Sequence, residues 1–272
     1  MEKTFKIVIS VLVAIALIGV IYLFMQQGNN NAPASMNKAQ VKNTIHSYLL
    51  DNPAILIQMS QKLQAQEQQK QQQQANSVIK QNADKIFNPK NNPIVGNKNG
   101  KVTLVEFFDY QCIHCENMYP VVQKLMKANP NLRVVFYDFP IFGEPSQYAA
   151  FAALYAHTQG KYLAMHDALF AANDVEGKMT DAKVNVLAKK VGLNLVAMKS
   201  YIKTQMDAMK AKKNMPNGVM GSFELAQLLH IQGTPAFIIA PTPSTGNPAG
   251  KTTFIPGASD GAALQQAIND AK

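Results

Sequence analysis

The only two cysteines among the 272 residues are Cys112 and Cys115, which lie two residues apart in the stretch FFDYQCIHC. A disulfide between such close neighbours closes too small a loop to constrain much of an unfolded chain, which argues against a structural role. A β-rich apolar run, residues 102–108, precedes the pair, and a helical pattern over residues 116–126 follows it. The sequence therefore predicts reactive thiols at a junction between a strand and a helix.

The pattern around the cysteines predicts a mixed α/β (α+β) domain. A further β-rich run over residues 132–137 completes a strand–helix–strand unit, and residues 144–230 are almost wholly helical in pattern. The remaining expected elements are strands at 236–239 and 252–255 and a last helix at 260–271. Residues 88–272 should thus form a small sheet that is interrupted by a large helical insertion at about 144–230.

The N-terminal region carries a long apolar run, the 19 residues 7–25, with Lys3 and Lys6 before it. At ~1.5 Å per residue, a helix of this length just spans a hydrocarbon layer of ~30 Å. The two lysines should hold the start of the chain on the cytoplasmic side, so that the cysteines lie outside the cytosol. Residues 1–34 are expected to be a membrane anchor, which the length favours, or a signal peptide cleaved near Ala32-Pro33-Ala34.

Residues 35–87 are predicted to form a helical oligomerisation stalk. Apolar residues recur at helical spacing over 41–49 and 55–63, whereas residues 64–77 are rich in glutamine and lack a large apolar side chain. The glutamine run should be an exposed spacer, and the apolar stretches should pack on the same segment of another copy in a homodimer or a trimer. Folding back on the main domain, or disorder of the glutamine run, are the alternatives. Residues 88–100, rich in Asn, Pro and Gly, are expected to be a linker.

Charge and histidine content narrow the function classes. The net charge of +9 comes from lysines scattered over the chain without an aromatic or glycine-rich pattern, which favours a solvated basic face over nucleic-acid binding. The cysteine pair has no second C-x-x-C and no pair of suitably spaced histidines to complete a zinc site. Besides His114, the histidines are His46, His157, His166 and His230. No metal and no cofactor is expected.

The position of Cys112 at a helix start predicts a stable thiolate. Free backbone N–H groups and the positive end of the helix dipole favour an anion there, so its pKa should lie well below the ~8.5 of a free cysteine. His114 can add a hydrogen bond or a positive charge to this sulfur, or it is an ordinary surface histidine. Cys115, one turn further, should be the shielded thiol that attacks the mixed disulfide between Cys112 and a client. Glu106 would assist as a general base if it is buried, because burial raises a carboxyl pKa.

Three motifs carry a resemblance to a known family: Val105-Glu106-Phe107-Phe108, Cys112-Ile113-His114-Cys115 and Gly233-Thr234-Pro235. They resemble those of the DsbA/DsbC/DsbG group of bacterial periplasmic thiol–disulfide oxidoreductases, which have the thioredoxin fold. The resemblance covers residues 88–272 and implies a cis bond between Thr234 and Pro235 that faces Cys112. It also implies that Ile113, Thr234 and Pro235 bind the client, with the Thr234 backbone pairing with an extended strand.

The motifs are similar to two subgroups at once. Ile113-His114 keeps the histidine of the DsbA oxidases without their proline, whereas Thr234 and the ending Ile255-Pro256-Gly257 are more similar to the DsbC/DsbG isomerases, which dimerise through an N-terminal domain. The helical, glutamine-rich stalk resembles the N-terminal extensions of Com-type and ScsC-type relatives. The resemblance implies a location in the periplasm of a Gram-negative bacterium, and a membrane redox partner, either a DsbB-like oxidant or a DsbD-like reductant.

The first hypothesis is an oligomeric enzyme that introduces or isomerises disulfide bonds in exported proteins with reduced or mispaired cysteines. One alternative is an isomerase or reductase that a membrane partner keeps reduced. Another is a stalked periplasmic chaperone in which the thiols are secondary, and a third is a membrane-tethered adaptor that uses residues 64–77 as a spacer.

Overall fold

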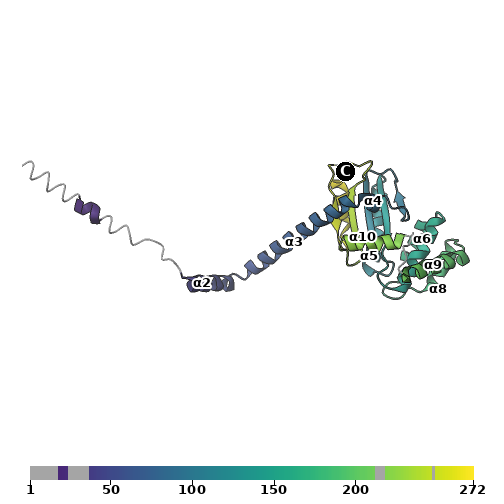
Figure 1. Cartoon of the computed structure of the whole chain (residues 1–272), viewed down its shortest axis with the longest axis horizontal. Helices are drawn as coiled ribbons and strands as arrows, with labels where there is room; N and C mark the ends of the chain where they lie inside the picture. Colours follow the sequence, from purple (N-terminus) through teal and green to yellow (C-terminus); the bar gives the residue numbers. More distant parts are fainter. Residues whose placement is uncertain (1–17, 24–36, 212–217, 247–248) are drawn as a thin grey trace, which may run out of the picture. The chain divides into compact units, whose positions relative to one another are not determined.

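The computed structural model describes residues 18–23, 37–211, 218–246 and 249–272 (Figure 1). The chain divides into two compact units, Met1–Gln66 and Glu67–Lys272. Most of the predicted membrane run at residues 7–25, and the predicted cleavage site near Ala32-Pro33-Ala34, lie outside the described residues. Among the helices that the structure does describe, none combines the length and the apolar character that a membrane crossing requires.

The described part of the first unit is helical and leaves its apolar side chains exposed. Helix α2 (Lys38–Asp51) begins with a capping box, in which Asn37 Oδ1 accepts from the Gln40 backbone at 2.9 Å and Gln40 Oε1 accepts from the Asn37 backbone at 3.0 Å. Helix α3 (Ala54–Gln81) starts in this unit and ends in the next. The exposed large apolar residues of α2 and of the first part of α3 are Val41, Ile45, Tyr48, Leu50, Leu56, Ile57, Met59 and Leu63.

The second unit is built around one sheet with the strand order β1-β3-β2-β4-β5 over its described residues. The strands are β1 (Ile94–Gly96), β2 (Val102–Phe108), β3 (Leu132–Asp138), β4 (Ala236–Pro241) and β5 (Thr253–Ile255). Strands β2 and β3 are parallel and are joined through α5 (Ile113–Ala128), whereas the other pairs are antiparallel. The four expected strands are confirmed. The expectation that residues 88–100 form only a linker is wrong, because β1 is a short edge strand whose signal the surrounding Asn, Pro and Gly residues hide.

The insertion comprises α6 (Glu144–Thr158), α7 (Tyr162–Ala171), α8 (Asp181–Lys190), α9 (Leu195–Lys210) and α10 (Gly218–Leu228). Its helices α6 to α9 form one core with α5, α11 (Gly261–Asp270) and one face of the sheet. Figure 1 shows α6, α8 and α9 gathered beside the sheet. Leu104, Val134 and Phe237 project from the central strands into this core, which also contains Cys115. The predicted fold class, a small sheet with a large helical insertion, is confirmed.

The opposite face of the sheet is covered by α10, by α4 (Ala83–Phe87) and by the end of α3. Its core contains Ala75, Ile79, Ile86, Phe87, Phe107 and Tyr137. The stalk was expected to extend to residue 87, but the second unit begins at Glu67 and includes this segment. The physical reason is that a sheet with two apolar faces needs a cover on each, and the apolar stripe over residues 78–87 supplies the second cover.

We expect Ile86→Ala to lower the free energy of unfolding of the second unit by about 2–5 kcal/mol, because Ile86 is fully buried and its removal leaves a cavity. The matched control is Ile57→Ala, since Ile57 is 63% exposed. In the isolated chain this substitution should lower the free energy of unfolding by less than about 0.5 kcal/mol. Urea unfolding of both variants measures the difference. Equal stability of the two variants would contradict the placement of α4 on the sheet.

Candidate active site

The register of β2 brings two loops to the same end of the sheet. Phe107, near the end of β2, pairs with Ala236 at the start of the antiparallel strand β4. The residues that follow β2 and the residues that precede β4 therefore lie side by side. The first loop carries Cys112, and the second carries Thr234 and Pro235.

Cys112 caps the N-terminus of α5, as the sequence predicts, with an extended backbone at φ −81° and ψ 118°. A tight turn leads to it, in which the Cys112 N–H donates to the Asp109 backbone oxygen at 3.1 Å. The bond between Thr234 and Pro235 is cis, which confirms the expectation. The Cys112 thiol donates to the Thr234 backbone oxygen at 3.2 Å, so this loop faces the cysteine directly.

The environments of the two cysteines move their pKa values in opposite directions. The pKa of Cys112 is lowered to about 6, chiefly because the Cys115 thiol hydrogen-bonds with its sulfur. The Thr234 side chain and backbone groups of Cys115 and His114 also stabilise the thiolate, while burial opposes them. Cys115 is fully buried, and burial raises its pKa well above the ordinary value. Near neutral pH the first sulfur is thus a thiolate and the second a thiol.

The other residues singled out in the sequence lie around this pair in different ways. The His114 side chain is exposed, and the contribution of this residue to the Cys112 sulfur comes from its backbone. Ile113 is half-buried beside Cys112. Glu106 is buried on the sheet face that also carries Leu104 and packs on α5, and burial raises the pKa of its carboxyl to about 8. Its role as a general base stays a prediction.

Sequence reasoning missed a buried polar network beside the cysteines. The Asp109 carboxyl accepts hydrogen bonds from the backbone of Gln111, from Ser146 Oγ and from the backbone of Phe142. The available signal was the presence of two polar residues, Asp109 and Gln111, directly after an apolar strand. Their partners Phe142 and Ser146 lie more than 30 residues away along the chain, and no local pattern identifies them.

His166 is a core residue. Its Nδ1 is 3.0 Å from the Tyr110 hydroxyl, and the rings of Phe108, Phe136 and Phe170 surround it. Burial lowers the pKa of His166 to about 3, so the ring is neutral. Over the described ranges no cluster of His, Cys, Asp and Glu side chains is suited to hold a metal ion.

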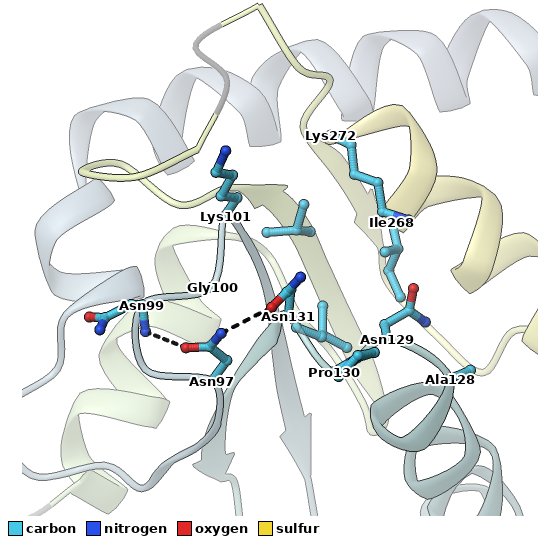
Figure 2. Close-up of a pocket in the computed structure, with 12 residues that line it drawn as sticks. Asn97, Asn99, Gly100, Lys101, Ala128, Asn129, Pro130, Asn131, Ile268 and Lys272 are labelled. Carbon is cyan, nitrogen blue, oxygen red and sulfur yellow. Dashed lines mark hydrogen bonds between the residues drawn. The ribbon is translucent and has the colours of Figure 1, made fainter.

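A pocket of about 430 Å³ lies far from the cysteines, between the starts of β2 and β3 and the end of α5. Figure 2 shows Asn97 between Asn99 and Asn131, with hydrogen bonds to both. Lys101 and Lys272 flank this pocket. Because Cys112 follows the opposite end of β2 and begins α5, the pocket is not part of the thiol site.

Two family models match the sequence, one over the domain that carries the cysteines and one over the N-terminal helical region. Residues 88–249 match the family model described as thioredoxin. The chain belongs to the thioredoxin family. Residues 37–75 match the model described as the copper resistance protein ScsC N-terminal domain.

Solved structures of similar proteins agree with these matches. The chain is 34% identical to BcfH of Salmonella enterica Typhimurium, with a TM-score of 0.71 over 86% of this chain and 95% of that one. It is 27% identical to ScsC of Proteus mirabilis in a transitional conformation, with a TM-score of 0.56 over 88% of this chain and 98% of that one.

Curated relatives share only part of the chain. The thiol:disulfide interchange protein DsbA of Bordetella pertussis is 26% identical over 149 residues, which are 55% of this chain and 68% of the relative. The Na⁺/H⁺ antiporter NhaA 1 of Salinispora arenicola is 28% identical over 153 residues, so the chain spans only 22% of that protein. Within the thioredoxin family, the matches confirm the resemblance to DsbA-type thiol–disulfide oxidoreductases, with an ScsC-like N-terminal region.

We expect the rate of Cys112 alkylation in the reduced protein to rise with pH, with a midpoint at about 6. Cys115→Ala removes the largest stabilising contribution to the thiolate and should shift the midpoint upward. His114→Ala is the control and should shift it less, because the imidazole is exposed. Mass spectrometry of the alkylated peptide measures the rates. A wild-type midpoint near the ~8.5 of a free thiol would refute the stabilised thiolate.

The same pKa shift predicts how stability depends on pH. The folded pKa of Cys112, about 6, lies below the unfolded value of ~8.5, so the thiolate stabilises the folded reduced protein above pH ~8.5. This contribution declines as the pH falls and is lost below about 6. Urea unfolding of the reduced wild type should therefore show a gain in stability between these values that Cys112→Ser lacks. An equal pH dependence of the two proteins would contradict the assignment.

Proposed function

We propose that the protein is a periplasmic thiol–disulfide oxidoreductase that introduces or isomerises disulfide bonds in exported proteins. The observation that carries the proposal is the Cys112 sulfur, whose pKa of about 6 makes it a thiolate, placed against the cis-proline loop. A stable thiolate is a good leaving group, so the disulfide between Cys112 and Cys115 is oxidising.

The exchange proceeds in two steps that conserve sulfur and electrons. In oxidation, a client thiolate attacks Cys112 Sγ of the disulfide, a mixed disulfide forms, and Cys115 leaves as a thiolate that takes up a proton. A second client thiolate then attacks the client sulfur and releases the Cys112 thiolate, so the client loses two electrons and the cysteine pair gains them. In isomerisation, the Cys112 thiolate attacks a mispaired client disulfide, and a client thiolate or Cys115 resolves the mixed disulfide.

The neighbouring residues receive roles in this scheme. Thr234 and Pro235, with Ile113, bind the client strand, and the Thr234 backbone supplies main-chain hydrogen bonds to it. Glu106 exchanges the proton of Cys115, which its pKa of about 8 allows near neutral pH. His114 is exposed at the edge of the site, where its side chain would contact an arriving client.

The N-terminal unit is proposed to hold copies of the chain together. The apolar side chains of α2 and of the first part of α3 are exposed in the single chain, and burying them against a second copy removes them from water. The match to the ScsC N-terminal domain over residues 37–75 supports this use. A homodimer is proposed, with a trimer as the other assembly, and either one offers a client more than one cysteine pair.

The proposed chemistry supports a periplasmic location and a membrane redox partner. Disulfide formation needs an oxidising compartment, and the apolar run of residues 7–25, with Lys3 and Lys6 before it, would direct export to the periplasm as an anchor in the inner membrane or as a cleaved signal peptide. A DsbB-like membrane oxidant would return the pair to the disulfide for oxidation. A DsbD-like reductant would keep it reduced for isomerisation.

Cys112→Ser should abolish exchange on both a reduced client and a client with scrambled disulfides, because it removes the attacking sulfur. Recovery of client enzyme activity in a redox buffer measures this, with Ser222→Ala as a folded control, because the Ser222 hydroxyl donates only within its own helix to the Gly218 backbone oxygen. If the double variant Cys112→Ser/Cys115→Ser keeps full function in cells and still suppresses client aggregation, the chaperone alternative replaces the proposal.

Deletion of residues 35–66 should give a monomer that keeps oxidase activity and loses isomerase activity, because it removes the exposed apolar helices and leaves the part of α3 that covers the sheet. Light scattering gives the mass, and the two client assays give the activities. A deletion protein that remains oligomeric would overturn the proposed role of the N-terminal unit.

Trapping with a thiol alkylator in cells distinguishes the two directions of exchange. A mostly oxidised cysteine pair supports the oxidase with its membrane oxidant, and a mostly reduced pair supports the isomerase with its reductant.

A further inference from the structure

Asp109 and Gln111 form a buried bridge between the cysteine loop and the helical insertion. Both side chains are almost fully buried. Asp109 Oδ1 accepts from the Gln111 backbone at 2.8 Å and from Ser146 Oγ at 2.7 Å, and Oδ2 accepts from the Phe142 backbone at 3.1 Å. Ser146 belongs to the first turn of α6, and Phe142 precedes that helix, so one carboxyl holds the entry to the insertion against the loop.

Gln111 makes the second half of this bridge. Its Nε2 donates to Ser146 Oγ at 2.9 Å, and its Oε1 accepts from the Gly177 backbone at 3.1 Å. The Gln111 backbone oxygen accepts from the Glu176 backbone at 3.0 Å. The segment between α7 and α8 is thus fixed to the residue directly before Cys112.

The backbone of Asp109 lies beside both members of the cysteine pair. Its oxygen accepts from the Cys112 N–H at 3.1 Å, and its amide favours the Cys115 thiolate, which lowers the pKa of Cys115 against the larger, opposite effect of burial. Cys115 is fully buried, so water cannot stabilise a negative charge on this sulfur. A main-chain donor at a fixed position therefore stabilises the charge whenever Cys115 is a thiolate.

We propose that Asp109, Gln111 and Ser146 form a positioning clamp that holds the Asp109 amide against Cys115 and so sets the rate of the steps in which Cys115 bears negative charge. In one direction the Cys115 thiolate attacks Cys112 Sγ of a mixed disulfide. The bond between Cys112 and Cys115 forms, the bond to the client breaks, and the client leaves as a thiolate that takes up a proton. The cysteine pair is oxidised and the client sulfur is reduced. In the other direction Cys115 is the leaving thiolate.

This inference rests on the proposed exchange and adds that the helical insertion tunes one of the two cysteines. A clamp that only stabilised the fold would affect both sulfurs through general loosening. The positioning role predicts a selective effect, because the clamp reaches the Cys115 sulfur through the Asp109 amide, whereas the main donor to the Cys112 sulfur is Cys115 itself.

Ser146→Ala in the full chain tests the clamp, since it removes the donor to Asp109 and the acceptor for Gln111. A mixed disulfide between Cys112 and a chromophoric thiol is formed, and its resolution by Cys115 is followed by stopped flow. We expect resolution about five- to tenfold slower than in the wild type, with the alkylation rate of Cys112 unchanged. Ser146→Thr keeps the hydroxyl and should restore the rate.

Ser222→Ala is the matched control, because Ser222 is equally buried and its hydroxyl donates to the Gly218 backbone oxygen at 2.9 Å within α10. It should leave both rates unchanged. Gln111→Met is the second variant, should Ser146→Ala fail to fold. It keeps the length of the side chain, loses the hydrogen bonds to Ser146 and Gly177, and should slow resolution in the same selective way.

The outcomes separate this inference from the proposed function. A wild-type protein that forms no mixed disulfide overturns the proposed function itself. A wild type that exchanges normally, together with unchanged resolution in the folded clamp variants, overturns the clamp alone. Equal slowing of resolution and of Cys112 alkylation also overturns it, because that result indicates a general structural role.

Discussion

The pairing of β2 with β4 is the constraint on which the site depends. Phe107 pairs with Ala236, so the loop after β2 and the loop before β4 meet at the same end of the sheet. A slip by one residue would turn every side chain of β2 to the other face and move Cys112 away from Thr234. The core on both faces of β2 fixes this register, because all seven of its residues are buried. The redox chemistry therefore depends on packing far from the sulfurs.

The two cysteines differ because one helix presents them to different surroundings. Cys112 lies at the N-terminus of α5, where backbone N–H donors are free, while Cys115 lies one turn inside the helix and faces the core. In the proposed exchange this difference in pKa gives each sulfur its own role, since the stable thiolate would react with the client and the buried thiol would complete the exchange. Asp109 then moderates the cost of charging the buried sulfur. In the proposed clamp the insertion contributes to the chemistry although its side chains touch neither sulfur in the contacts described above.

The sequence was sufficient where the signal is local or motif-based. The strands around residues 102–108 and 132–137, the position of Cys112 at a helix start, and the cis bond before Pro235 were all predictable. Edge strand β1 was not, because three residues carry no clear alternation. The cover that α3 and α4 place on the sheet and the partners of Asp109 were not predictable either, because these contacts join segments far apart along the chain.

The contact between α3 and the sheet also affects the edge strand β5. Strand β5 is at the outer edge of the sheet, and its Phe254 amide points outward, where Gln72 Oε1 accepts its hydrogen bond at 3.2 Å. A free edge amide invites pairing with any extended polypeptide, including another copy. By accepting this hydrogen bond, Gln72 removes one unpaired edge group that an extended polypeptide would otherwise use for strand addition at β5.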